Sequence, residues 1–216
     1  MRRAPSARDD DAVLDHLVYA GPDLAEAVAR VTELTGVTPA PGGSHVGVGT
    51  ANHLADLGAG MYLEVIGPDP AQPDPAQPRP FGIDDLTEPA LVAWAVRTTD
   101  LDTTITNARA HGFDPGDARE MSRETQDGEL LRWRLTPPST PGTLHPFLID
   151  WGATPHPTTR GLPSLPLLMV TGTHPDPDSV LAVTDALGLE LLVRRADKAG
   201  LTAALRTPEG RQVALS

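Results

Sequence analysis

The stretch Val13-Leu14-Asp15-His16-Leu17-Val18-Tyr19 decides the fold, together with the turn Gly21-Pro22-Asp23 and the helical pattern that ends at Gly36. Its apolar content is typical of a buried strand. Asp23 suits a helix N-cap, because its side chain can accept hydrogen bonds from the free amides of the first turn. Gly36 suits the left-handed C-cap. The stretch therefore predicts a strand followed by an amphipathic helix.

The same order recurs twice along the chain. A second strand and helix pattern turns at Asp100 and closes at Gly112, and a third turns at Asp176 and Asp178 and closes at Gly188. Further strand candidates follow each helix. They cover residues 44–48, 50–57 and 61–66 in the first copy, 118–122, 130–135 and 144–151 in the second, and 189–194, 201–206 and 212–215 in the third.

These copies predict an α+β chain of paired βαβββ modules at residues 12–68 and 91–152. A third, shorter βαβββ-like half-module follows at residues 166–216. Between the first two lies the Pro-rich connector 69–90. Its two tandem Asp-Pro-Ala-Gln-Pro repeats, at 69–78, should be extended and solvated. A second connector covers 153–165. The half-module has short strands with exposed edges, so we expect it to pack on the paired modules or to form a homodimer interface.

Composition narrows the class of partner. The 216 residues carry 17 basic and 29 acidic side chains, a net charge of −12. This balance repels phosphate backbones, so we expect a small-molecule ligand, with no nucleic acid and no membrane as partner. The segment Met1–Asp11 has paired arginines without a signal-peptide pattern, which indicates a cytoplasmic location. Because there is no cysteine, any metal must be held by histidine and carboxylate.

Four segments carry a family resemblance: LDHLVY at 14–19, GTANH at 49–53, MYLEVIGP at 61–68 and HPFLIDWG at 145–152. A βαβββ unit used twice, with a histidine on its first strand and a glutamate on its last, resembles the vicinal oxygen chelate superfamily. Within it, the chain is most similar to the glyoxalase-like domain proteins. The resemblance implies that two modules pair and curl their sheets into a half-open barrel, with a metal or a substrate in the cleft.

His16 and Glu64 are the candidate catalytic residues and the first candidate metal ligands. Side chains two apart on a strand share a face, so His16 should share one with Leu14 and Val18. Burying an imidazole or a carboxylate without a partner costs several kcal/mol. In the family's arrangement the two strands line one cleft, so both side chains can converge on Zn, Fe(II), Mn or Ni. A hydrogen bond between them without a metal is the alternative.

The second module departs from the family's pattern of metal ligands. Alignment of the two modules places Ala93 opposite the first-module histidine, and alanine cannot bind a metal. It places Ile149 opposite the glutamate, and Asp150 would face the cleft only after a one-residue slip. His145 shares the parity of Ile149 and completes the favoured three-ligand set, although a role as a loop residue or substrate donor stays open. The candidate metal ligands are therefore His16, Glu64, His145 and Asp150.

Several polar and aromatic residues are candidates for substrate binding. Asn52 and His53 are adjacent on one strand, so only one can face the cleft, and the resemblance favours Asn52. The tryptophans either line an apolar pocket or pack in the core. Two arginines that flank Trp133 on one strand face could grip an anionic group or could face solvent. The candidates are Asn52, His53, Trp94, Arg132 and Arg134.

Two functions follow from the resemblance. The first is a metal-dependent lyase, isomerase or dioxygenase that acts on a small substrate with vicinal oxygens. The second is a metal-free protein that binds or sequesters a small molecule, of the bleomycin-resistance type. Ala93 favours the second function, and the pair of His16 and Glu64 favours the first.

Overall fold

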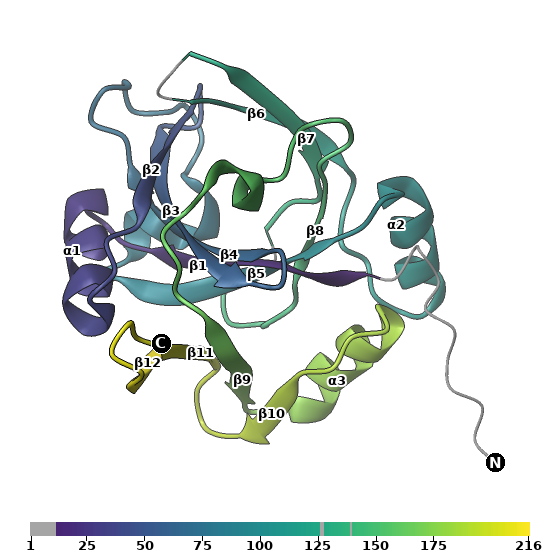
Figure 1. Cartoon of the computed structure of the whole chain (residues 1–216). Coiled ribbons are helices and arrows are strands. Elements are labelled where there is room, and N and C mark those ends of the chain that lie inside the picture. Colours follow the sequence, from purple (N-terminus) through teal and green to yellow (C-terminus); the bar gives the residue numbers. More distant parts are fainter. Residues whose placement is uncertain (1–11, 126–127, 139) are drawn as a thin grey trace.

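The computed structural model describes residues 12–125, 128–138 and 140–216; Met1–Asp11, on which the expected location rests, lies outside them. Two βαβββ modules form a closed barrel with strand order β1-β4-β3-β2-β6-β7-β8-β5 (Figure 1). The prediction of paired modules is confirmed, and the barrel closes because β5 pairs with β1. The first module holds β1 (Val13–Ala20), α1 (Leu24–Thr35), β2 (Ala40–His45), β3 (Thr50–Gly58) and β4 (Met61–Pro68). The second holds β5 (Ala90–Arg97), α2 (Leu101–Ala110), β6 (Arg119–Glu124), β7 (Leu130–Leu135) and β8 (Phe147–Asp150).

The helix boundaries follow from local chemistry. The side chain of Asp23 accepts a hydrogen bond from the backbone N–H of Glu26 at 3.0 Å. Gly36 ends α1 with φ at 75°, a left-handed conformation that glycine adopts without a Cβ clash. Asp100 caps α2 in the same way, through the N–H of Thr103. Each helix therefore begins directly after the strand that lines the barrel.

A β-bulge in β1 changes the predicted alternation. The β1–β5 register shifts between Leu14 and His16, so β1 has one extra residue there. His16 lines the interior of the barrel and Val18 packs in the interior cluster, whereas Leu14 packs against the outer apolar cluster. The expectation that Leu14 shares a face with His16 is therefore wrong. The bulge leaves Asp15 buried directly beside His16.

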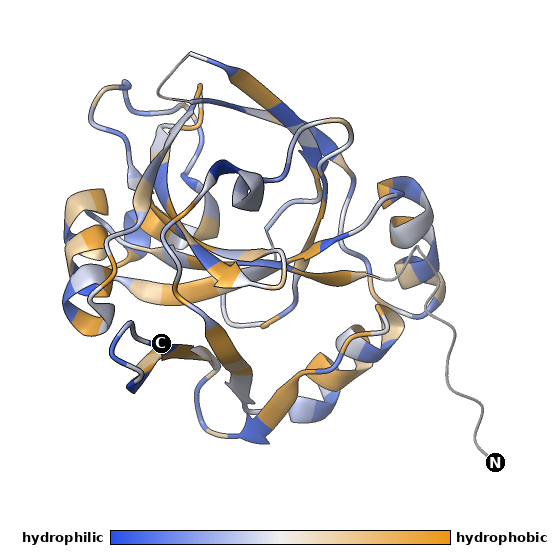
Figure 2. Cartoon of the chain, in the orientation of Figure 1, coloured by the Kyte–Doolittle hydropathy of each residue, from blue (hydrophilic) through white to orange (hydrophobic). Residues whose placement is uncertain are grey.

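Apolar side chains form two clusters, one inside the barrel and one between the barrel and its surrounding elements. Helices α1 and α3 (Pro177–Ala186) each carry both orange and blue residues (Figure 2). The inner cluster includes Val18, Leu54, Ile66, Trp133 and Phe147. The outer cluster includes Leu17, Leu63, Val65, Leu101 and Leu205.

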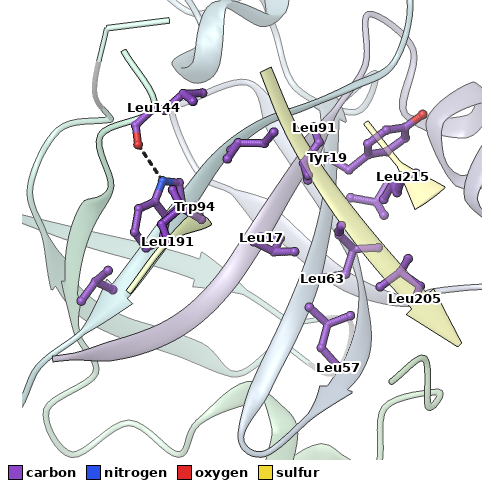
Figure 3. Packing of buried hydrophobic residues seen from close by; sticks show 14 of the residues in the cluster. Leu17, Tyr19, Leu57, Leu63, Leu91, Trp94, Leu144, Leu191, Leu205 and Leu215 are labelled. Carbon is purple, nitrogen blue, oxygen red and sulfur yellow. Dashed lines mark hydrogen bonds between the residues drawn. The ribbon is translucent and has the colours of Figure 1, made fainter. Parts of the chain in front are cut away.

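The carboxy-terminal unit packs against the outside of the barrel. It consists of β9 (Leu167–His174), α3 (Pro177–Ala186), β10 (Leu192–Arg195), β11 (Gly200–Arg206) and β12 (Gln212–Leu215). The predicted element order is found, but the sheet order β10-β9-β11-β12 differs from that of the barrel modules. Leu205 and Leu215 lie beside Leu63 and Tyr19 of the barrel in one apolar cluster (Figure 3). Within the described residues, no helix is both long and apolar enough to span a bilayer.

The two connectors are partly built into the barrel. The first contains the short helix η1 (Pro80–Asp85), in which Ile83 is buried and Phe81 lines the barrel cavity. The second contains η2 (Pro157–Arg160), and Pro157 also lines the cavity. The tandem repeats at 69–78 form neither helix nor strand, whereas η1 follows them because an isoleucine and a phenylalanine there gain by leaving water.

Candidate functional site

The barrel encloses a cavity of about 320 Å³. This is roughly twice the size of a cavity that takes up benzene, about 150 Å³, so it is enough for a small organic molecule. Most of its wall is apolar, which is typical of a ligand-binding pocket. The polar side chains that line it are His16, His45, Thr50, Asn52, Tyr62, Glu64, Arg119 and Arg123.

Glu64 is the carboxylate of this cavity and is only 7% exposed. The side-chain amide of Asn52 donates to Glu64 Oε1 at 2.6 Å. The Nε2 atoms of two histidines approach the same carboxylate, His16 at 3.8 Å from Oε2 and His45 at 3.8 Å from Oε1. Both separations are too long for a hydrogen bond. The two histidines therefore face Glu64 without being bonded to it.

The other ring nitrogen of each histidine is engaged. His16 Nδ1 lies 2.6 Å from Asp15 Oδ1, and His45 Nδ1 lies 3.0 Å from Thr50 Oγ1. An ionised carboxylate can only accept, so in neutral His16 the proton sits on Nδ1 and the Nε2 lone pair faces Glu64. Burial lowers the pKa of His45, although the nearby Glu64 carboxylate opposes this shift. His45 is therefore neutral near pH 7.

Asp15 is a buried anchor behind the cavity. It is 0% exposed, and it accepts hydrogen bonds from His16, from Trp151 Nε1 at 3.2 Å and from His156 Nε2 at 2.9 Å. Burial alone would raise the pKa of Asp15, but the hydrogen bonds from His156 and His16 outweigh it and hold the pKa well below its usual range. Asp15 is therefore ionised at neutral pH and ties the second connector to β1.

Arg123 supplies a buried positive charge. It is 3% exposed, lines the cavity and donates from one guanidinium nitrogen to Asn52 Oδ1 at 3.3 Å. Burial lowers the pKa of Arg123, and the neighbouring Tyr62 and Glu64 oppose the shift, so the side chain keeps its charge. The amide of Asn52 therefore links Arg123 to Glu64.

The structure brings together some of the predicted site residues and separates others. His16, Glu64 and Asn52 all line the cavity. His145 does not line it, because β8 begins only at Phe147, and its ring packs against Phe113. Asp150 also lies outside the cavity lining, and its carboxylate accepts from the N–H of Gly152 at 2.8 Å.

The remaining substrate-binding candidates lie on outward faces. His53 Nδ1 is 3.0 Å from the carbonyl oxygen of Pro39. Arg134 forms a two-point ion pair with Asp102 of α2, and Arg132 shares its strand face. Trp94 belongs to the outer cluster and donates to the carbonyl oxygen of Leu144 at 2.9 Å (Figure 3). None of these four residues lines the cavity described above.

Comparison with known proteins places this arrangement in a family. Residues 14–188 match the model of the glyoxalase-like domain. The chain belongs to the glyoxalase-like domain family. A crystal structure of a hypothetical protein from Staphylococcus aureus superposes with a TM-score of 0.68 at 11% identity, covering 95% of this chain and 99% of that chain. No curated protein matches the chain.

Two solved enzymes are among the structures that match this glyoxalase-like domain. A triple mutant of 4-hydroxymandelate synthase from Streptomyces coelicolor has a TM-score of 0.54 at 13% identity, covering 93% of this chain and 61% of that one. Methylmalonyl-CoA epimerase from Mycobacterium tuberculosis has a TM-score of 0.40 at 17% identity, covering 68% and 91%. At such identities the likeness concerns the fold alone. The resemblance to the glyoxalase-like domain proteins is confirmed.

The possible metal donors of this cavity all come from the first module. In the second module, the residues that face the interior are Ala93 and Ala95 on β5 and Phe147 and Ile149 on β8. The histidines and the glutamate come instead from β1, β2 and β4 of the first module. Alignment of the two modules had already placed Ala93 and Ile149 opposite the histidine and the glutamate of the first module. His45 and Arg123 were not recognised from the sequence as cavity residues.

The histidine nitrogens and glutamate oxygens of the cavity are atom types that bind a divalent ion. They do not, however, already surround a single position. Metal–nitrogen and metal–oxygen bonds of about 2.0–2.2 Å sum to about 4.2 Å, so one ion can reach two atoms that are 3.8 Å apart. In residues 12–125, 128–138 and 140–216, no three His, Asp or Glu side chains already form a chelating group. An ion would therefore have to draw His16, His45 and Glu64 together.

Proposed function

We propose that this glyoxalase-like domain is a metal-dependent enzyme, of lyase, isomerase or dioxygenase type, that acts on a small substrate with vicinal oxygens. His16, His45 and Glu64 would hold the ion, which can be Zn, Fe(II), Mn or Ni. One observation carries the proposal: both imidazoles have Nδ1 engaged and present Nε2 to the same carboxylate at 3.8 Å. His145 and Asp150 are not included, because they do not line the cavity.

The side chains around these donors have defined roles in this proposal. Asp15 and Thr50 fix the ring orientation of the two histidines, as outer partners of metal ligands commonly do. Asn52 holds Glu64 Oε1, so Oε2 is the oxygen that would take a proton from the substrate once it is displaced from the ion. The bound metal would polarise a substrate oxygen as a Lewis acid. The apolar wall excludes water and strengthens these electrostatic interactions.

Metal binding to purified protein tests the proposal directly. Chelator-treated, untagged protein is titrated with Zn, Fe(II), Mn and Ni by calorimetry, and bound metal is measured by elemental analysis. We expect one ion per chain, with loss of binding in His16→Ala, His45→Ala and Glu64→Gln. His145→Ala is the matched control and should bind normally, because this histidine lies outside the cavity lining. A parent protein that takes up no ion under these conditions would overturn the proposal.

A second candidate function is metal-free binding of a small molecule. It is favoured by the inward-facing Ala93 and Ala95, which give the second module no donor on β5. Under this alternative, Glu64 is a buried hydrogen-bonding group that is satisfied by Asn52. The two functions separate in the titration above: retention of an organic ligand by a protein that binds no metal supports the second.

A further inference from the structure

The buried arginine of the cavity has more hydrogen-bonding capacity than the protein uses. A guanidinium carries five N–H donors, and Arg123 gives one of them to Asn52 Oδ1. In the described parts of the chain, no carboxylate lies within ion-pair distance, 4.0 Å, of this guanidinium. A charge that is 3% exposed and lacks a direct counter-ion is costly unless something pairs with it.

Aromatic side chains line the same cavity. The rings of Trp133 and Trp151 lie 5.2 Å apart at 40°, and those of Phe81 and Phe147 lie 5.7 Å apart. The Nε1 of Trp133 is buried without a hydrogen-bond acceptor in the described structure. A ligand oxygen can satisfy this donor, which otherwise costs about 1–3 kcal/mol. The wall therefore suits a flat apolar body with at least one polar atom.

Resting on the proposed function, we propose that the substrate is a small carboxylic acid with an aromatic or similarly flat apolar body. Arg123 binds its carboxylate and the indoles of Trp133 and Trp151 contact its body. A guanidinium matches a carboxylate in a two-point arrangement, and the pair is strongest where water is excluded. The cavity of about 320 Å³ is roughly twice the size of one that takes up benzene, about 150 Å³, so it has room for one ring with a side chain.

The position of Arg123 also explains how such a ligand would meet the donor cluster. Asn52 contacts Arg123 through its oxygen and Glu64 through its nitrogen, so one amide separates the two charges. A carboxylate held by Arg123 therefore places the neighbouring carbon of the substrate close to Glu64, the residue that we assign to proton transfer. Arg119, on the same face of β6, adds a second positive charge at the cavity.

Binding of two matched probes tests this inference without any metal. Phenylacetate and its neutral amide, phenylacetamide, are titrated into chelator-treated protein, with tryptophan fluorescence and calorimetry as readouts. We expect phenylacetate to bind about ten- to a hundredfold more tightly, the effect of a charge-assisted hydrogen bond. Arg123→Met should reduce this preference to about one. Arg132→Met is the matched control, because Arg132 faces outward, and it should keep the preference.

Every result of this titration either supports or overturns the inference. Equal binding of the two probes, or no binding of either, overturns the inference. If Arg123→Met fails to fold, as judged by circular dichroism, Arg123→Lys replaces it: a reduced but retained preference for phenylacetate supports the inference, and an unchanged preference overturns it. Because no metal is present, failure of the proposed metal site leaves this result unaffected. Phenylphosphonate serves as a further arm, and binding tighter than that of phenylacetate overturns the assignment to a carboxylate.

Discussion

Asn52 and Glu64 form the shortest polar contact between side chains lining the cavity, 2.6 Å from the amide nitrogen to Oε1. The same amide accepts from Arg123 through its oxygen. Its two ends are therefore fixed, and it can neither rotate nor release Glu64 without breaking a contact. This relationship sets the direction in which the carboxylate faces His16 and His45.

Replacement of Asn52 should weaken metal binding without removing a ligand. Asn52→Leu keeps the approximate shape of the side chain but leaves Glu64 Oε1 and Arg123 without their shared partner. Loss of an outer hydrogen bond of this kind typically lowers metal affinity about 10- to 100-fold, and we expect this range in a calorimetric titration. His53→Ala, one residue away on the outward face of β3, is the control. Unchanged affinity in Asn52→Leu would show that the amide does not position Glu64.

Asp15 should make the free energy of unfolding decrease at acidic pH. Its pKa is held well below the ordinary value of about 3.9, so the folded state resists its protonation. Its contribution to stability is therefore fully present above about pH 5 and is lost as the pH falls through 4 towards the folded pKa. The slope for one proton is at most about 1.4 kcal/mol per pH unit.

Urea unfolding of the parent and of Asp15→Asn between pH 7 and pH 3 measures this effect. We expect Asp15→Asn to cost about 3–5 kcal/mol at pH 7, as for a broken buried ion pair, and the difference to shrink below pH 4. Asp102→Asn, which removes an exposed ion pair with Arg134, should change stability little. A difference that stays constant down to pH 3 would contradict the role given to Asp15.

Regular strands made part of the site predictable from sequence. Asn52 and Glu64 lie on β3 and β4, which are long enough for the alternation of faces to hold, and both were placed correctly with respect to the cavity. His145 was misplaced because the alternation was extended back beyond the start of β8, to residues that are not part of a strand. Alternation predicts a face only where the backbone is extended.

His45 and Arg123 could not be recognised because their signal is not local. The segment Ala40–His45 is rich in glycine and proline, yet it forms β2 because it pairs with β3 and with β6 of the other module. The strand predicted at 118–122 stopped one residue before Arg123, whereas β6 continues to Glu124. Both residues lie where β2 meets β6, a junction between segments about 80 residues apart, as the pairing of Ser44 with Glu124 shows.

Position 42 should require glycine, because two neighbouring side chains leave no room for a Cβ. A Cβ at this position would overlap Asn52 Oδ1 and lie 2.6 Å from a guanidinium nitrogen of Arg123, so Gly42→Ala must displace both side chains. We expect a loss of about 1–3 kcal/mol in the free energy of unfolding, as for other overpacked sites. Gly200→Ala in β11 is the control, because its Cβ would meet Thr173 at an ordinary distance of 3.4 Å. Equal stability of the two variants would contradict the prediction.

The carboxy-terminal unit should unfold together with the barrel. Leu205 of β11 is fully buried in the apolar cluster that also contains Leu63 of β4, so Leu205→Ala removes contacts that join the two parts. We expect a loss of about 2–5 kcal/mol. Met169→Ala changes a side chain that is 50% exposed on the same sheet, and it should stay within about 0.5 kcal/mol of the parent.

Two spectroscopic probes show whether Leu205→Ala destabilises the barrel and the carboxy-terminal unit together. All three tryptophans lie in the barrel modules, so their fluorescence reports the barrel, whereas circular dichroism reports the whole chain. Because one apolar cluster spans both parts, both probes should give the same urea midpoint in the parent, and both should shift together in Leu205→Ala. A dichroism transition that precedes the fluorescence transition in the parent would show that the carboxy-terminal unit unfolds independently, and that the shared cluster does not couple the two.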